Sequence, residues 1–354
     1  MKKSKKVFPS LVRASHKFQF YRKKVLGEGN SVVYRGSYEG KEVAVKRIVL
    51  IPNITGDGDN CEAQMKLKHE NVVTILAVEE DDDFRYVVLE LCCATLFQVI
   101  QKTWDEKKPP LPPDGEVMYQ MADGLDYIHS QKLTHREIKP ENILISRNGK
   151  IKLSDFGLSK QTEGKCYVTG LKGTLPWMAP ELFQANHEKV EIEIAQKCDV
   201  FSCGCVFFVF LTRENGGIHP FGDIVDHLQI YANIQEGNAI NLHKANDNHP
   251  LEGKLIQKMI QGDPVKRITS ADVKNEIKYL LSKRNSTINP LTPQISLCNQ
   301  GEPASSPQTF TVNYGKHGAE SHVKTFPNHD DDEVASYDID CASTSFPVNS
   351  RGSP

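Results

Sequence analysis

His135-Arg136-Glu137-Ile138-Lys139-Pro140-Glu141-Asn142 is the stretch on which the prediction of the fold rests, and Asp155-Phe156-Gly157 follows it closely. A carboxylate at Glu137 is suited to orienting an incoming hydroxyl group. Asn142 and Asp155 offer oxygen atoms, the ligands that Mg²⁺ prefers. A carboxylate followed by two oxygen donors is a set of side chains that could serve phosphoryl transfer with bound Mg²⁺.

Two further motifs flank this stretch. Val43-Ala44-Val45-Lys46 lies upstream and Ala179-Pro180-Glu181 lies downstream. In this order the motifs resemble the eukaryotic protein kinase family over roughly residues 19–284, and Gly173-Thr174-x-x-Trp177 resembles its Ser/Thr type. The resemblance implies an α+β fold with two lobes, a β-rich N-lobe (19–91) and a helical C-lobe (92–284). The family signature has Asp where this chain has Glu137.

The resemblance also assigns the residues around a nucleotide. Lys46 would hold the α- and β-phosphates and pair with an acidic residue, for which Glu62 is the candidate; a surface role for Glu62 is the alternative. Lys139 would lie beside the transferred phosphate. The remaining nucleotide-binding residues would be Leu26, Gly27, Gly29, Val33, Ala44, Glu90, Cys92 and Leu144. The third glycine of the family's loop is missing and Tyr34 comes one residue early, which predicts a shortened lid over the phosphates.

Other positions are expected to support the site rather than to react. His135 is more plausible as a backbone anchor than as a general base. By resemblance, Asp199 caps the backbone of the catalytic loop, Arg267 pairs with Glu181, and the Thr174 hydroxyl contacts the catalytic carboxylate and Lys139.

The segment between Asp155 and Glu181 is the expected activation segment, with hydroxyl groups at Thr162, Tyr167, Thr169 and Thr174. Arg136 could pair with a phosphate added to it. Thr169 is the preferred phosphorylation site, and simple solvation of the hydroxyl groups is the alternative.

Local patterns also predict particular elements. Strands are expected over residues 71–76 and 84–89, with the acidic run 79–83 as a hairpin tip between them. A helix is expected from Asp114, with Asp114 as its cap, and an apolar helix from Asp199 that buries Cys203 and Cys205. The last helix is expected from about Thr269 to Lys283.

Composition limits the class of protein. The chain has 354 residues, is 39% hydrophobic, and carries a net charge of −2, so neither nucleic acid nor an anionic membrane is expected as its main partner. Nine scattered cysteines favour a reduced, cytoplasmic chain, and no apolar run is long enough to span a bilayer. Residues 1–18 are predicted to be a basic flexible terminus, and residues 285–354 a disordered tail that could dock partners.

Finer motifs resemble the kinase domain of the unfolded-protein-response sensor kinase/endoribonuclease: Glu42 to Ile48, Glu90 to Leu96, Asn142 to Ser146 and Phe201 to Phe207. Its sensor, membrane span and ribonuclease domain are not expected here, whereas a homodimer stays open. The leading hypothesis is a Ser/Thr protein kinase that uses ATP and Mg²⁺ and phosphorylates a protein substrate, slowed by Glu137. The alternative is a nucleotide-binding pseudokinase that acts as a scaffold or allosteric regulator.

Overall fold

The computed structural model describes residues 11–13, 18–29, 31–50, 64–104, 109–155, 160–161, 165–169, 174–183 and 186–288. The chain separates into two units, Met1–Pro293 and Gln294–Pro354. All of the described residues belong to the first unit. The predictions for Glu62, for Thr162 and for the tail beyond residue 288 therefore lie outside the described residues.

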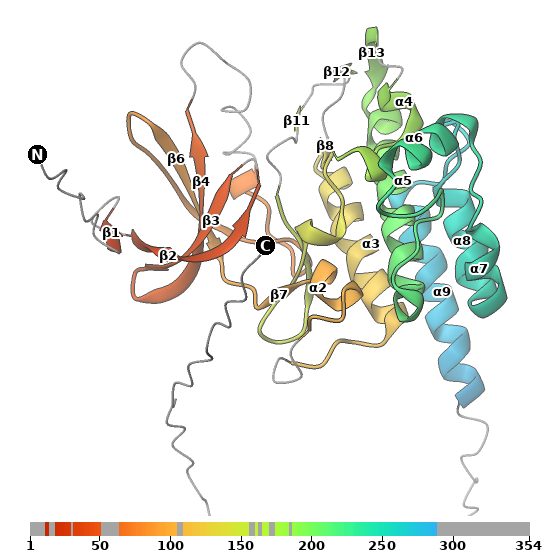
Figure 1. Cartoon of the computed structure of the whole chain (residues 1–354), viewed down its shortest axis with the longest axis horizontal. Coiled ribbons are helices and arrows are strands. Elements are labelled where there is room, and N and C mark those ends of the chain that lie inside the picture. Colours follow the sequence, from red (N-terminus) through yellow and green to blue (C-terminus); the bar gives the residue numbers. More distant parts are fainter. Residues whose placement is uncertain are drawn as a thin grey trace, which may run out of the picture. The chain divides into compact units, whose positions relative to one another are not determined.

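An antiparallel sheet of six strands, in the order β1-β2-β3-β4-β6-β5, forms the N-lobe (Figure 1). Its strands are β1 (Leu11–Arg13), β2 (Phe18–Glu28), β3 (Val32–Tyr38), β4 (Lys41–Val49), β5 (Ile75–Glu80) and β6 (Phe84–Glu90). Alternate residues point into one apolar cluster, as the period of two in a strand requires. Phe18 and Phe20 of β2 pack there against Val43 and Val45 of β4 and Tyr86 of β6.

The C-lobe is mainly helical and has an extended apolar core. Its helices are α2 (Leu96–Ile100), α3 (Asp114–Ser130), α4 (Pro180–Phe183), α5 (Ile192–Leu211), α6 (His227–Glu236), α7 (Leu242–Asn248), α8 (Pro250–Met259) and α9 (Ser270–Ile288), with the 3₁₀ turns η1 (Pro140–Asn142), η2 (Leu175–Trp177) and η3 (Arg213–Asn215). Short strands complete the lobe: β7 (Ala94–Thr95), β8 (Leu133–Thr134), β9 (Ile143–Ile145), β10 (Ile151–Leu153), β11 (Lys160–Gln161), β12 (Lys165–Thr169) and β13 (Asn186–Glu191).

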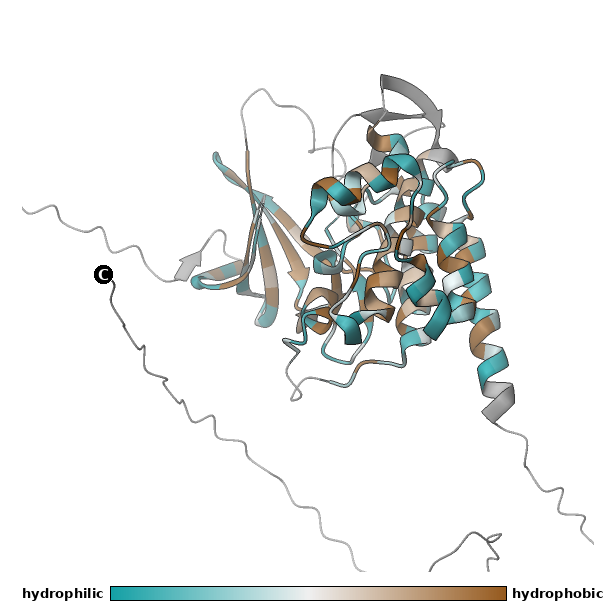
Figure 2. Ribbon diagram, turned by 45° about the vertical axis from the view of Figure 1, so that its right-hand side comes forward, coloured by the Kyte–Doolittle hydropathy of each residue, from teal (hydrophilic) through white to brown (hydrophobic). Residues whose placement is uncertain are grey.

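Burial differs between the central and outer helices of this lobe. In α5 the thiols of Cys198, Cys203 and Cys205 are buried among apolar neighbours, as predicted for the last two. The outer helix α9 carries alternating hydrophobic and hydrophilic bands (Figure 2). Val273 and Ile277 form its buried face. No helix in the described part of the chain combines the length and hydropathy that a membrane span requires.

The expected strand over residues 71–76 is wrong in its position. β5 begins at Ile75 and runs to Glu80, so that only residues 81–83 form the hairpin tip. The segment before it belongs to the C-lobe instead. The side-chain amide of Asn71 donates to the carbonyl of Ile151 (2.8 Å). The N–H of Val73 donates to the carbonyl of Leu153, and the N–H of Leu153 donates to the carbonyl of Asn71 (2.9 Å each), so these two bonds use backbone groups that strand pairing would need.

One helix cap and two helix boundaries differ from the predictions, although α3 begins at Asp114 as expected. Pro113, not Asp114, precedes α3, and the Asp114 carboxylate instead accepts two hydrogen bonds from Arg213 (2.8 and 3.0 Å). α5 begins at Ile192, which places Asp199 inside the helix. α9 runs from Ser270 to Ile288 and continues past Lys283, where Arg284 forms an ion pair with Glu252 of α8.

Candidate active site

Two buried side chains fix the backbone of the stretch 135–142. The Asp199 carboxylate accepts hydrogen bonds from the N–H groups of His135 and Arg136, both at 2.7 Å. The imidazole of His135, which is fully buried, lies 2.9 Å from the carbonyl of Ser154. The predicted roles of Asp199 as a cap and of His135 as an anchor are confirmed.

Both anchors keep one charge state at neutral pH. Burial acts to raise the pKa of the Asp199 carboxyl, but the hydrogen bond from His129 (2.9 Å) and the two backbone bonds outweigh it and hold that pKa below its ordinary value. Burial lowers the pKa of His135. Asp199 is therefore a carboxylate and His135 a neutral imidazole, which suits an anchor.

Lys139 connects the carboxylate of the loop to the segment that follows. Its ammonium group donates to Glu137 Oε1 (2.8 Å) and to Thr174 Oγ1 (3.0 Å). The side chains of Glu137 and Lys139 are 13% and 20% exposed, so this contact is shielded from water but still reachable. The expected contact between Thr174 and Lys139 is confirmed.

Asn142 and Asp155 are brought to the same region by the loop and by the end of β10. Asn142 donates through its amide nitrogen to the carbonyl of Glu137 (2.9 Å), which leaves its amide oxygen for another partner. Ser154, the neighbour of Asp155, donates through both its N–H and its hydroxyl to the carbonyl of Asn142 (2.9 Å each). An amide oxygen and a carboxylate form a donor set that fits Mg²⁺.

Lys46 of β4 forms an ion pair with Asp155, so the two lobes meet at this point. Sequence reasoning missed this contact and proposed Glu62, which lies outside the described residues, as the partner of Lys46. A signal was nevertheless present. Lys46 was assigned to the phosphates and Asp155 to the metal that binds them, and groups with those roles must lie close together.

The loop expected over the phosphates is short. Glu28 of β2 pairs with Val32 of β3, and the N–H of Gly29 donates to the carbonyl of Ser31 (3.1 Å). The register of β2 shifts on both sides of Val25, so a bulge absorbs the early position of Tyr34. A Cβ atom at Gly27 or Gly29 would have no neighbour within 4 Å, so open space lies beside both glycines.

The other predicted nucleotide residues lie on neighbouring strands. Val33 is opposite Lys46, and Ala44 is opposite Leu89 of β6. Leu26 is half exposed on β2, and Leu144 is half-buried on β9.

Glu90 and Cys92 belong to the segment between the lobes. The Glu90 carboxylate accepts from the N–H of Thr74 (2.8 Å) and pairs with Lys152 of β10 (2.8 Å), a contact that the sequence did not suggest. Burial raises the pKa of the Cys92 thiol to about 12. Glu90 thus fixes this segment with its side chain, whereas Cys92 is a neutral thiol.

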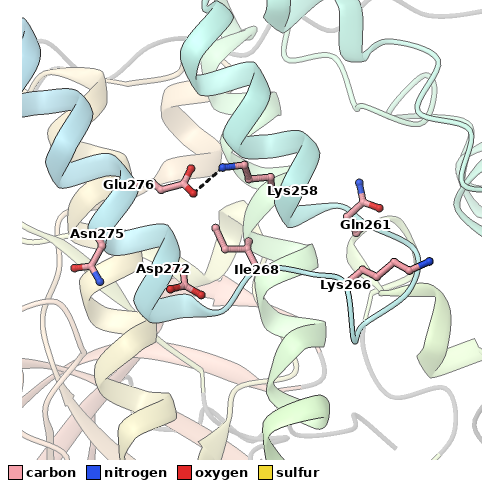
Figure 3. Close-up of a pocket in the computed structure, with 7 residues that line it drawn as sticks. All are labelled: Lys258, Gln261, Lys266, Ile268, Asp272, Asn275 and Glu276. Carbon is pink, nitrogen blue, oxygen red and sulfur yellow. Dashed lines mark hydrogen bonds and ion pairs between the residues drawn. The ribbon is translucent and has the colours of Figure 1, made fainter.

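A hollow of about 610 Å³ shares no residue with this site (Figure 3). It lies between the end of α8 and the first turns of α9. Lys258 and Glu276 on its wall pair with each other at 2.7 Å.

The comparisons with known proteins agree with this geometry. The protein kinase domain family matches residues 20–279. The chain belongs to the protein kinase family. The predicted resemblance and the bilobal α+β fold are thereby confirmed.

Several relatives of this kinase domain are kinase/endoribonucleases. It is 34% identical over 276 residues to the serine/threonine-protein kinase/endoribonuclease ire-1 of Caenorhabditis elegans, covering 73% of this chain and 27% of the relative. It is 36% identical over 244 residues to the serine/threonine-protein kinase/endoribonuclease IRE2 of Homo sapiens, covering 66% and 25%. The chain thus spans about a quarter of the length of these relatives.

Proposed function

We propose that the chain is a Ser/Thr protein kinase that transfers the γ-phosphoryl group of Mg·ATP to a hydroxyl group of a protein, in the cytoplasm. The observation that carries the proposal is the bridge from Glu137 through Lys139 to Thr174. It supplies a carboxylate for the hydroxyl and a cation for the phosphate side by side, on a loop held by Asp199.

Each residue of the site has a role in this reaction. Glu137 orients the substrate hydroxyl and accepts its proton while the hydroxyl oxygen bonds to the γ-phosphorus. The proton then passes from Glu137 to solvent. The bond from that phosphorus to the bridging oxygen breaks, and ADP leaves with its electrons. Lys139 stabilises the charge on the moving phosphoryl group. Asn142 and Asp155 would hold Mg²⁺, whose charge neutralises the phosphates.

The nucleotide would lie between the lobes. Lys46 would exchange part of its contact with Asp155 for the phosphates, and Gly27 and Gly29 have the open space that lets phosphate oxygens approach the backbone. The apolar groups of the adenine site would be Leu26, Val33, Ala44 and Leu144, with Glu90 and Cys92 contributing backbone groups.

Glu137 sets the expected rate. A glutamate has one more methylene than the aspartate of the family, which moves its carboxylate by roughly 1 Å, and a displacement of that size costs on the order of 10²-fold in rate. We therefore expect slow but measurable transfer.

One observation favours the pseudokinase alternative. The ion pair of Lys46 with Asp155 neutralises both groups without a nucleotide, and such a pair could hold the lobes together in a scaffold that turns over nothing.

The test is transfer of labelled phosphate from Mg·ATP to a generic Ser/Thr peptide, with nucleotide binding measured in parallel. We expect the wild type to transfer phosphate and Lys46→Met to abolish transfer. Relative to the wild-type rate, Glu137→Gln should lower the rate and Glu137→Asp should raise it. If neither the wild type nor Lys46→Met transfers phosphate while the wild type still binds ATP, the chain is a pseudokinase instead.

A further inference from the structure

The positive charge of the chain is concentrated in its first 24 residues. They contain nine lysine and arginine residues and no aspartate or glutamate. The rest of the chain holds the other 34 of the 43 basic residues and all 45 acidic residues. The net charge of −2, on which the expectation of no anionic partner rests, therefore averages over two parts of opposite sign.

The last three basic residues of this segment lie on the surface of the N-lobe. Arg22, Lys23 and Lys24 belong to β2, and all three are exposed. The ammonium group of Lys24 lies over the ring of Tyr21, 5.0 Å from its centroid. Within the described residues, no ion pair joins Lys23 or Lys24 to a carboxylate. The charges of these two lysines are therefore available to a partner.

The pairing of β1 with β2 brings the earlier basic residues toward the same edge (Figure 1). The two strands are antiparallel and Leu11 is opposite Tyr21, so the chain that precedes Leu11 starts beside Arg22. Lys6 is five residues before Leu11, and the length of the chain keeps it within roughly 18 Å of that residue. The lysines at positions 2, 3, 5 and 6 can therefore act together with the exposed residues of β2.

Three acidic residues of the N-lobe border this surface without reversing its sign. Glu42 contacts both Arg35 of β3 (2.9 Å) and Arg147, so two guanidinium groups surround one carboxylate. Asp81 accepts three hydrogen bonds within its own hairpin. Glu28 is four residues from the last lysine of β2, which corresponds to roughly 13 Å along a strand. The surface around Arg22, Lys23 and Lys24 thus stays positive.

We propose that these residues of β2, together with the basic residues at positions 2, 3, 5, 6, 13 and 17, form a surface that binds the anionic face of a lipid bilayer. Seven of the nine basic residues are lysines, which act on a charged lipid surface as point charges, whereas arginine has the planar fork that suits the phosphates of nucleic acid. Apolar residues stand between the charges in the sequence, and a bilayer accepts such side chains among its headgroups: Val7, Phe8, Leu11 and Val12.

The first test is flotation of the whole chain with lipid vesicles. One set of vesicles contains phosphatidylcholine with about 30% phosphatidylserine, and the other contains phosphatidylcholine alone; we expect binding only to the first. Raising NaCl from about 0.1 to about 1 M shortens the Debye length from about 10 to about 3 Å and should release the chain. Free phosphoserine at about 1 mM should not release it, because the surface responds to the potential of the bilayer rather than to a single headgroup.

The second test reverses two charges of the surface. We expect Lys23→Glu/Lys24→Glu to weaken binding to the phosphatidylserine vesicles by about thirtyfold or more, because each lysine near an anionic surface contributes about a factor of five. The matched control is Lys254→Glu/Lys278→Glu, which makes the same change in net charge at exposed positions of α8 and α9. It should keep the affinity within about threefold, since charges away from the bilayer are screened. Thermal melting checks that both variants fold.

Two results would overturn the proposal. The first is that the wild type does not bind the phosphatidylserine vesicles, and if a single-stranded RNA of about 20 nucleotides binds instead, nucleic acid is the partner. The second is that both double variants weaken binding equally, because net charge alone would then account for it. None of these measurements uses ATP, so their outcome does not depend on whether the chain is an active kinase.

Discussion

Removing the guanidinium of Arg267 should destabilise the C-lobe more than any exposed ion pair could. Arg267 is 1% exposed and pairs with Glu181 through two hydrogen bonds of 2.6 and 2.9 Å, which confirms the predicted pair. Its remaining N–H groups donate to the carbonyls of Gln261 (2.8 Å), Lys197 (2.8 Å) and Gly262 (3.2 Å). In Arg267→Met the stem keeps its packing, but all five bonds are lost.

The expected loss is about 4 kcal/mol of unfolding free energy. Breaking a buried ion pair by removing one partner typically costs about 3–5 kcal/mol, because the other charge stays behind without compensation. Glu181, whose side chain is only 19% exposed, is that charge here. For a domain of this size, about 4 kcal/mol corresponds to a fall in Tm of roughly 8–16 °C.

Urea unfolding at neutral pH, followed by circular dichroism, measures this loss, and melting curves give the shift in Tm. Lys258→Met is the control, since the ion pair of Lys258 with Glu276 is 55% and 38% exposed and should contribute less than about 1 kcal/mol. In Arg267→Met/Glu181→Leu no charge is stranded, so part of the loss should be recovered. A loss below about 1 kcal/mol in Arg267→Met, with an unchanged m-value, would refute the reasoning.

Three further predictions concern packing, pH and thiols. Gly36→Ala should destabilise the N-lobe by about 1–3 kcal/mol, because its Cβ would lie 2.5 Å from the carbonyl of Gln19, whereas Gly27→Ala should be nearly neutral; thermal melting compares the two. Burial lowers the pKa of His219 to about 3 and also lowers that of His135, so both stay neutral in the folded chain while the unfolded chain takes up protons below about pH 6.5. The free energy of unfolding should therefore fall as the pH drops below 6.5, by up to about 1.4 kcal/mol per pH unit for each of the two histidines. Urea unfolding at several pH values should show a smaller slope for His219→Gln than for the wild type. Burial raises the pKa of the thiols of Cys198, Cys203 and Cys205, so brief iodoacetamide treatment and peptide mass mapping should find them unmodified until the chain is denatured.

The sequence was most informative where a motif fixes a contact between distant residues. Asp199 as a cap, His135 as an anchor and the pair of Arg267 with Glu181 were predicted correctly, and for Asp199 and Arg267 the resemblance also supplied the partner. The local pattern did as well for the strand expected over residues 84–89, which the structure shows from Phe84 to Glu90.

Prediction from the sequence failed where a residue far along the chain determines which groups form hydrogen bonds. Asp114 looked like a helix cap, but Arg213, almost a hundred residues later, takes its carboxylate. The strand expected from Asn71 gave way because Ile151 and Leu153 bind that segment to the C-lobe. Neither competitor leaves a trace in the local pattern, which is why the local pattern alone gave a wrong cap for α3 and a wrong position for the strand.

The loop around Glu137 indicates where the extra methylene must act. Asp199 holds the backbone before Glu137, and the side-chain amide of Asn142 holds the carbonyl of Glu137. The backbone therefore cannot shift to accommodate a longer side chain. The added length must instead appear as a displacement of the carboxylate, which Lys139 still reaches at 2.8 Å. The substitution should therefore cost alignment of the substrate hydroxyl and leave the phosphate side of the site intact. Restoring aspartate should raise kcat while the KM for ATP stays the same.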